Sequence, residues 1–325
     1  MLDRLGFVGE RLFRSVFVVI LIMVVSFFMV RLAPGDVVDF LTEGGPVDQE
    51  YIDQLRQHLG LDRPLHVQFL IYMRDLLTFD LGFSYRQQDP VLDLILQRMP
   101  ATLILAGTVL VFSLVFGTVL GISAARHQGK WQDSAVTGLS LLGYATPNFW
   151  LGLMIVLAFA VWFPILPPYG MATIGSGYTG FAYAADVALH LVLPTIALGT
   201  HYMGVFARIT RAAMIEVADM EFVKAARAKG ITERQVVWRH VFRNALLSVV
   251  TYTGLQAGNL ISGTVLIETV FAWPGVGRLA YDSIVSRDYP VLLGTFLVTS
   301  VLVIVINLIT DIVYTFVDPR IEVRA

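Results

Sequence analysis

The stretch ATLILAGTVLVFSLVFGTVLGISAA, residues 101–125, decides the fold. It contains no Asp, Glu, Lys or Arg. A run of about 20 apolar residues is long enough to cross the hydrocarbon core of a bilayer as a helix. In lipid a helix is favoured because it satisfies every backbone polar group within the segment. The sequence therefore predicts a membrane-spanning helix here.

Similar apolar stretches occur on both sides of this one, and apart from Arg14 at the start of the first they contain no Asp, Glu, Lys or Arg. They are residues 13–30, 135–163, 187–207, 245–267 and 291–310. Over the whole chain 56% of residues are hydrophobic and 15% are charged, against roughly 25% charged in soluble domains. We therefore expect an all-α polytopic membrane protein with about six transmembrane helices. The first stretch exceeds the ~7–15 residues of a signal-peptide core and has no small-residue cleavage site after it, so we expect a retained span rather than a signal peptide.

The distribution of Lys and Arg predicts the orientation. Residues 208–243 hold eight basic and four acidic residues, and Arg4, Arg11, Arg14, Arg126, Lys130, Arg320 and Arg324 flank other spans. Basic loops remain in the cytoplasm, which places both termini and residues 208–243 inside. Four parts follow: a cytoplasmic tail with the first span (1–31), an extracytoplasmic segment (32–100), a core of five helices that includes the loop 208–243 (101–318), and a cytoplasmic tail (319–325).

The extracytoplasmic segment should be small and helical. Ile52, Leu55 and Leu59 recur at helical spacing before Gly60, which predicts a helix that stops there. A second amphipathic stretch, residues 91–99, should end at Pro100, with Leu92, Ile95, Leu96 and Met99 on one face.

Several chemistries lack their residues. The chain has no Cys, and it has no phosphate-binding Gly-x-x-x-x-Gly-Lys-Ser/Thr, His-Glu-x-x-His or Gly-x-Ser-x-Gly motif. We expect no catalytic residues, no metal site and no cofactor in this chain. A net charge of −2 argues against a nucleic-acid partner. An ion-coupled carrier usually has ionisable groups within its spans; here His190 and His201 stand alone and are expected to be inter-helix groups.

The cytoplasmic loop contains the most informative segment, DMEFVKAARAKG, residues 219–230. It predicts a short helix with Asp219 capping its start and Gly230 ending it. Thr232 to Gln235 should form a capping box that opens a second helix to about Arg243. The small side chains of Ala225 and Ala226 should let another protein approach closely.

This segment resembles the cytoplasmic signature of ABC importer permeases, Glu-Ala-Ala-x-x-x-Gly, with Lys224 in place of Glu. It is closer to the version of the peptide/nickel-type permeases, because the chain has Ala226-Arg227-Ala228-Lys229-Gly230 and then Arg243-Asn244-Ala245. Further blocks in family order cover nearly the whole chain. They begin at Arg31, Leu59, Asp80, Arg98, Pro147, Glu268 and Arg287.

The resemblance implies a type I ABC importer permease fold in a bacterial cytoplasmic (inner) membrane. The chain would pair with a second homologous permease subunit and form half of a path for di- or oligopeptides or a related small solute. Two ATP-binding subunits would bind ATP and Mg²⁺, and an extracytoplasmic solute-binding protein would deliver the solute. The ATPase-coupling residues would be Asp219, Glu221, Lys224, Ala225, Ala226, Arg227, Gly230 and Thr232.

Two further sets of residues are candidates for the path and for an outer gate. Gln256, Asn259 and Gly263 share one helical face and could line the path, or could instead bond between helices beside Gly254 and Gly258. Asn148 beside Pro147 is a second path candidate, although Pro147 could simply kink the helix. Glu268, Pro274 and Gly275 resemble the family's outer gate, and a simple turn explains them as well.

Two other functions stay open at this point. The chain could be a self-sufficient secondary carrier or channel, or a membrane scaffold without a transport role.

Overall fold

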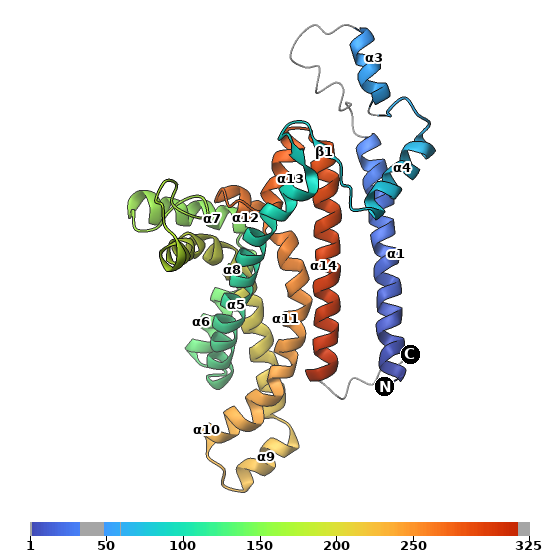
Figure 1. The fold of residues 1–325 in the computed structure, drawn as a ribbon. Coiled ribbons are helices and arrows are strands. Elements are labelled where there is room, and N and C mark those ends of the chain that lie inside the picture. Colours follow the sequence, from blue (N-terminus) through green and yellow to red (C-terminus); the bar gives the residue numbers. More distant parts are fainter. Residues whose placement is uncertain (1, 33–48, 59, 318–325) are drawn as a thin grey trace. The chain divides into compact units, whose positions relative to one another are not determined.

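The computed structural model describes residues 2–32, 49–58 and 60–317, and most of them are helical (Figure 1). The family block that begins at Arg31 continues beyond Leu32 outside the described residues, as does the tail 319–325. The chain divides into two compact units. Unit 1 comprises residues 1–100 and 275–304, and unit 2 comprises residues 101–274 and 305–324.

Unit 1 contains the segment expected outside the membrane. Its elements are α1 (Leu2–Leu32), α3 (Gln49–His58), α4 (Leu65–Leu77), the strands β1 (Phe83–Ser84) and β2 (Asp89–Pro90), the start of α5 (Val91–Arg126), α13 (Val276–Val285) and the start of α14 (Tyr289–Val317). The two strands pair antiparallel. Gly60 follows α3 with φ +66°, so the predicted helix and its glycine stop are confirmed.

Two sequence expectations in this unit are wrong. Pro100 does not end a helix, because α5 runs through it for 36 residues. The buried face of its first turns consists of Val91, Leu94 and Ile95, which pack against Leu279 and Val291, whereas Leu96 is exposed. This face is buried because it packs against α13 and α14. No sequence pattern had indicated these packing partners.

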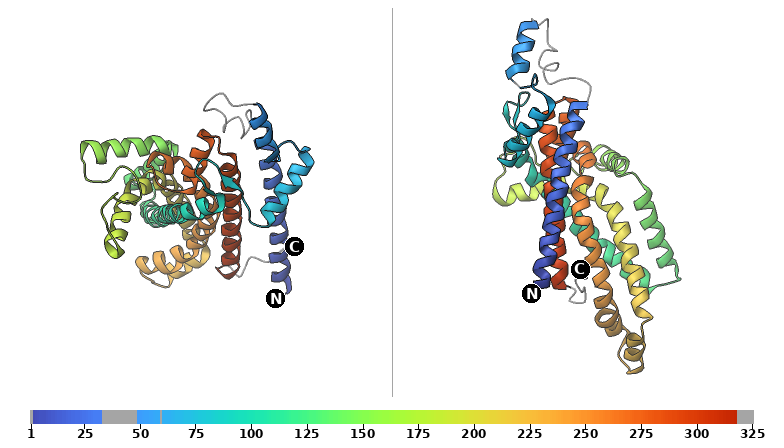
Figure 2. Two further views of the ribbon diagram at one scale, coloured as in Figure 1. Left: turned by 45° about the horizontal axis from the view of Figure 1, so that its top comes forward. Right: turned by 90° about the vertical axis from the view of Figure 1, so that its right-hand side faces the viewer.

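Unit 2 is built around α8 (Gly180–Ala218). It also contains α6 (Trp131–Ala145), α7 (Asn148–Val156), the π-helix η1 (Leu157–Trp162), α9 (Glu221–Ala228), α10 (Glu233–Gln235), the π-helix η2 (Val236–Phe242), α11 (Arg243–Gly263), α12 (Val265–Val270) and the rest of α5 and α14. Both α6 and α11 pack along α8, side by side with it in Figure 2. Gly117 and Gly121 let α5 approach α8 so closely that a Cβ at either position would meet the α8 backbone.

The apolar helices agree with a membrane protein. Fewer of them than the expected six are both long and apolar enough to cross a bilayer as single described helices. Among the described residues, α5, α8 and residues 289–310 of α14 are long and apolar enough to cross a bilayer. A fourth crossing is added if α6 and the helix 148–162 together form one broken span. Pro147 does more than kink that region: the two helices meet at 99°.

Candidate functional site

The predicted coupling segment lies at the end of α8 and forms a packed hairpin. Val223 and Ala226 of α9 are buried in a cluster with Met214 and Val217 of α8, Ile122 of α5 and Val236, Val241 and Ala245 beyond the turn. Short helices are unstable alone, and tertiary packing supplies most of their stability. The cluster therefore fixes α9 rigidly to the body of unit 2.

The turn after α9 depends on Gly230. Its φ is +78°, and its N–H donates to the carbonyl of Arg227 at 3.0 Å. Ile231 N–H reaches back to the carbonyl of Ala226 at 3.4 Å. Such a left-handed residue ends many helices, and glycine adopts it without a steric cost. The helix thus ends one residue before Lys229, close to the predicted stop.

The other predicted caps are wrong. Met220 precedes α9 and makes no side-chain cap bond, while Asp219 ends α8 instead. Thr232 occupies the cap position of α10, but its hydroxyl donates to the side-chain oxygen of Gln235 at 3.0 Å, so no capping box forms. The second helix is also no separate element, because α10, η2 and α11 follow one another without a break.

The exposed face of α9 combines charged residues of both signs with one aromatic and one small residue. Glu221, Phe222, Lys224, Ala225 and Arg227 are exposed. Ala226 is buried against the chain's own core, so only one of the two alanines can meet a partner. We call the exposed face of residues 220–230 the α9 surface.

Two ion pairs order this surface. Lys224 Nζ contacts Glu221 Oε1 at 2.8 Å, and Arg227 bonds both carboxylate oxygens of Glu233 at 3.0 and 3.2 Å, which ties α9 to α10. The hydrogen bonds from Arg227 lower the pKa of Glu233, and the bond to Glu221 raises the pKa of Lys224. Each of these two shifts favours the charged form of its group, Glu233 as a carboxylate and Lys224 as an ammonium.

The path candidates on α11 lie in different surroundings. Asn259 is exposed and Gln256 is partly buried, whereas a Cβ at Gly263 would approach the Tyr202 hydroxyl oxygen to 3.0 Å. The two packing glycines lie on another face: Gly258 is buried, and a Cβ there would meet Asn307 Oδ1 at 2.5 Å. The small-residue contact is thus separate from the two amides. Asn148 is partly buried at the first turn of α7.

The gate candidates do not form an exposed cluster. Glu268 is completely buried in α12, and Thr102 Oγ1 donates to its Oε1 at 2.8 Å. Nearby, the Trp273 indole N–H donates to the carbonyl of Ala101 at 2.8 Å. Pro274 closes unit 2, and Gly275 precedes α13 in unit 1. Within unit 2, Glu268 therefore joins α12 to the part of α5 that contains Thr102.

A buried ion pair was missed from the sequence. Asp133 near the start of α6 accepts two bonds from Arg211 of α8, at 2.5 and 2.8 Å, and a third from Gly129 N–H at 3.0 Å. Its side chain is 8% exposed. In the sequence, Arg211 is only one of the eight basic residues in the loop 208–243. No local pattern connects it to Asp133, which is 78 positions away.

Comparison with known proteins agrees with this architecture. The pattern of the family described as binding-protein-dependent transport system inner membrane component matches residues 117–323, and the corresponding N-terminal family pattern matches residues 4–106. The chain is 38% identical over 332 residues to a di/tripeptide transport system permease protein of Pseudomonas aeruginosa, covering 98% of this chain and 99% of the relative. It is 36% identical over 318 residues to a dipeptide transport system permease protein of Escherichia coli K12, covering 93% and 94%.

Solved structures support the fold. An inward-facing MetNI methionine ABC transporter aligns with a TM-score of 0.52 at 19% identity, covering 70% of this chain and 97% of that one. An amino acid ABC transporter crystallised with histidines aligns at 0.51 and 15% identity, covering 70% and 94%. The matches along nearly the whole sequence lead to one assignment: this chain belongs to the binding-protein-dependent transport system inner membrane components, the permease subunits of ABC importers.

Proposed function

We propose that this chain forms half of the translocation path of a bacterial peptide importer. The observation that carries the proposal is the α9 surface, a short exposed helix fixed to the transmembrane body by a buried apolar cluster. A force applied to such a helix moves the elements beneath it instead of bending a loop. The names of the relatives, which refer to dipeptide and di/tripeptide transport, support peptides as the solute.

The membrane arrangement is part of the proposal. Six spans would be α1, α5, α6 with α7 and η1, α8, α11 and α14, with both termini and α9 in the cytoplasm. The basic loop 208–243 supports this orientation. The segment 32–100 would then face the extracytoplasmic side.

The partners would be a second permease subunit, two ATP-binding subunits on the cytoplasmic side and a solute-binding protein outside. ATP and Mg²⁺ would be bound by the ATP-binding subunits. The α9 surface offers them an exposed aromatic residue, Phe222, between charged residues of both signs. Aromatic side chains in a charged surround are typical of protein interfaces.

The path would run along the face of α11 that contains Gln256 and Asn259. Their separation from the Gly258–Asn307 contact supports this role, since the helix already uses another face for packing. Glu268 would act in the outer gate through its bond to Thr102, which joins α12 to α5 and would have to break if the two move apart.

The experiment is co-purification of the tagged chain with its ATP-binding subunits. The membranes come from cells that express this chain together with the proposed partner subunits. Gly230→Pro should abolish their association, because proline cannot adopt φ +78° and removes the N–H that bonds Arg227. Phe222→Ala should weaken association without disturbing the turn. The control is Phe181→Ala, an exposed aromatic residue at the opposite end of α8.

Unchanged association of both variants would contradict the proposal. Reconstitution separates it from a self-sufficient carrier or channel: the chain alone in liposomes should show no peptide flux, and flux should require the other subunits and ATP.

A further inference from the structure

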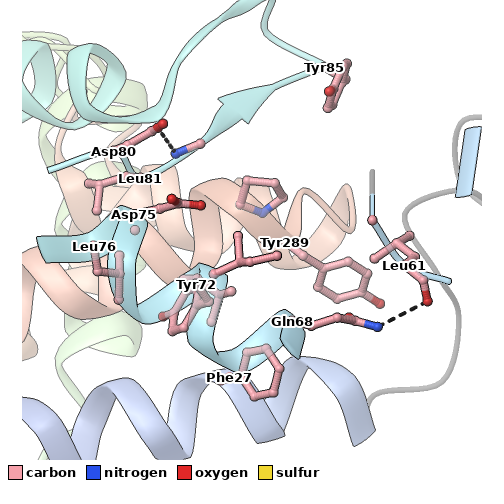
Figure 3. Close-up of a pocket in the computed structure, with 16 residues that line it drawn as sticks. Phe27, Leu61, Gln68, Tyr72, Asp75, Leu76, Asp80, Leu81, Tyr85 and Tyr289 are labelled. Carbon is pink, nitrogen blue, oxygen red and sulfur yellow. Dashed lines mark hydrogen bonds between the residues drawn. The ribbon is translucent and has the colours of Figure 1, made fainter. Parts of the chain in front are cut away.

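A cavity lies within unit 1, lined by residues that belong to neither α9 nor α11. The cavity measures about 300 Å³ and lies between α1, α4, residues 80–85 and the start of α14 (Figure 3). This volume is at the lower end of pockets that hold small molecules. Its walls are largely aliphatic and aromatic, with Phe27, Tyr72 and Tyr289 among the rings.

Two buried side-chain oxygens on α4 have no hydrogen-bond partner among the residues that the structure describes. The Gln68 side-chain nitrogen donates to the carbonyls of Leu61 at 3.1 Å and Arg63 at 2.6 Å, which fixes the orientation of the amide (Figure 3). Its oxygen Oε1 is therefore turned away from both carbonyls, is buried and accepts no hydrogen bond within the described part of the chain. The hydroxyl of Tyr72, one turn further along α4, is also buried and has no hydrogen-bond partner among the described residues.

Such atoms are rare in folded proteins because a buried polar group without a partner is destabilising. Gln68 and Tyr72 are four residues apart and share one helical face. Both line the cavity. Burial also raises the pKa of Tyr72 to about 12, so its phenol stays neutral at physiological pH.

The charged groups of the cavity are all acidic. Asp75 and Asp80 line it, and its sixteen lining residues include no Lys, Arg or His. Asp75 uses Oδ1 for Arg74, at 2.8 and 3.0 Å, and Asp80 uses Oδ1 for Gly82 N–H at 2.9 Å. The second oxygen of each carboxylate has no bond to any residue that the structure describes.

We propose that this cavity binds a primary ammonium group attached to an apolar body. A primary ammonium has three N–H donors and no acceptor, which matches an amide oxygen, a phenol oxygen and two carboxylates. Aromatic faces add attraction for a cation, and the aliphatic wall accommodates the apolar part. Two sources carry this chemistry: the free amino end of a small molecule or peptide, and the ethanolamine headgroup of a phospholipid.

The test is a ligand-observed NMR titration of the full chain in phosphatidylcholine nanodiscs. The probes are 2-phenylethylamine, its N,N,N-trimethyl analogue, which keeps the charge but has no N–H, and neutral 2-phenylethanol. The primary amine should bind about tenfold or more tightly than either analogue, as expected for hydrogen bonds to charged groups. Equal binding of the alcohol or of the trimethyl analogue would overturn the proposal.

Variants test the residues. Tyr72→Phe removes one oxygen and Asp75→Asn removes one charge, and each should weaken binding of 2-phenylethylamine about tenfold. Asp93→Asn, an exposed carboxylate of α5 that does not line the cavity, should bind as the unaltered chain does. Unchanged binding in both cavity variants would reject the site, and an unaltered thermal unfolding profile shows that they remain folded.

Nanodiscs with phosphatidylethanolamine separate the two sources. A headgroup in the cavity would compete with the probe and lower its apparent affinity, whereas an unaltered affinity would assign the site to soluble amines. The inference does not rest on the proposed transport function, because binding is measured on this chain alone.

Discussion

The ion pair between Arg227 and Glu233 contributes little to the free energy of unfolding, but it links α9 to α10 across the Gly230 turn. Both side chains are largely exposed, so the pair should contribute less than about 1 kcal/mol. The pKa of Glu233 is lowered in the folded chain, so its contribution is present above the unfolded pKa and is lost as pH falls through the folded pKa. Glu233→Gln should therefore loosen the Gly230 turn at pH 7, and its effect should disappear once the pH falls below the lowered folded-state pKa of Glu233.

Hydrogen exchange of the amides of Gly230 and Ile231 measures this effect. At pH 7 the variant should exchange up to about fivefold faster than the unaltered chain, the factor that corresponds to 1 kcal/mol. After correction for intrinsic exchange, the difference should shrink as the pH is lowered through the folded-state pKa of Glu233, which lies below its ordinary value. A difference that does not change as Glu233 becomes protonated would contradict the assignment to the ion pair.

The pair of Asp133 and Arg211 should matter more, because its carboxylate is buried. Asp133→Asn leaves the guanidinium without its partner, and we expect a loss of about 1–3 kcal/mol, reduced from the fully buried case because Arg211 is 31% exposed. Thermal unfolding of the purified chain measures the loss. The double variant Asp133→Asn, Arg211→Met should regain part of it, and a double variant worse than the sum of both single ones would argue against this explanation.

At the residue scale, the sequence predicted residues with a local structural role better than it predicted contacts between residues far apart in the chain. Gly230 was predictable because a left-handed turn restricts the residue type locally. Glu268 was not, since its burial depends on Thr102, which is 166 positions away, and nothing near Glu268 in sequence specifies that partner. Asp133 is the same case. The caps at Asp219 and Thr232 failed because several local bonds of similar energy compete at a helix end.

At the scale of elements, the approach of α5 to α8 makes a matched comparison possible. A Cβ at Gly121 would lie 2.5 Å from Thr210 Cβ and 2.6 Å from the carbonyl oxygen of Ala207, whereas a Cβ at Gly107 has nothing within 4 Å. Both glycines are in α5. Gly121→Ala should destabilise the chain by about 1–3 kcal/mol through overpacking.

Gly107→Ala is the control and should be neutral or stabilising by up to about 1 kcal/mol, because alanine favours helix. Thermal unfolding of the two variants in the same detergent gives the comparison. Equal midpoints for both would mean that the two helices do not meet as the structure describes.

Elements were predictable where the apolar pattern is long and were not where breaks are ambiguous. The apolar runs in α5, α8 and α14 follow directly from hydropathy. Pro100 and Pro147 carry the same local signal, yet α5 continues through the first and α6 ends two residues before the second. The difference comes from packing: the turns around Pro100 are held by α13 and α14 within unit 1. Neither π-helix has a recognisable sequence signal.

At the scale of the whole molecule, the proposed orientation can be tested with single cysteines. The chain contains no Cys, so an introduced one is the only thiol. Gln87→Cys and Lys229→Cys are exposed positions in the outer segment and in the α9 surface. A membrane-impermeant maleimide should label the first in intact spheroplasts and the second only after lysis. The reverse pattern would invert the orientation.

The unbroken run from α10 through η2 into α11 also affects which changes of length the chain tolerates. A π-turn holds one residue more than the α-turn it replaces, and the helix on either side keeps its direction. Loss of one residue within 236–242 would therefore convert η2 to regular α-helix and leave Gln256 and Asn259 facing as before. Loss of one residue from α11 itself would rotate everything beyond it by about 100°. A homologue could therefore be one residue shorter within η2 without changing which side chains face which neighbour.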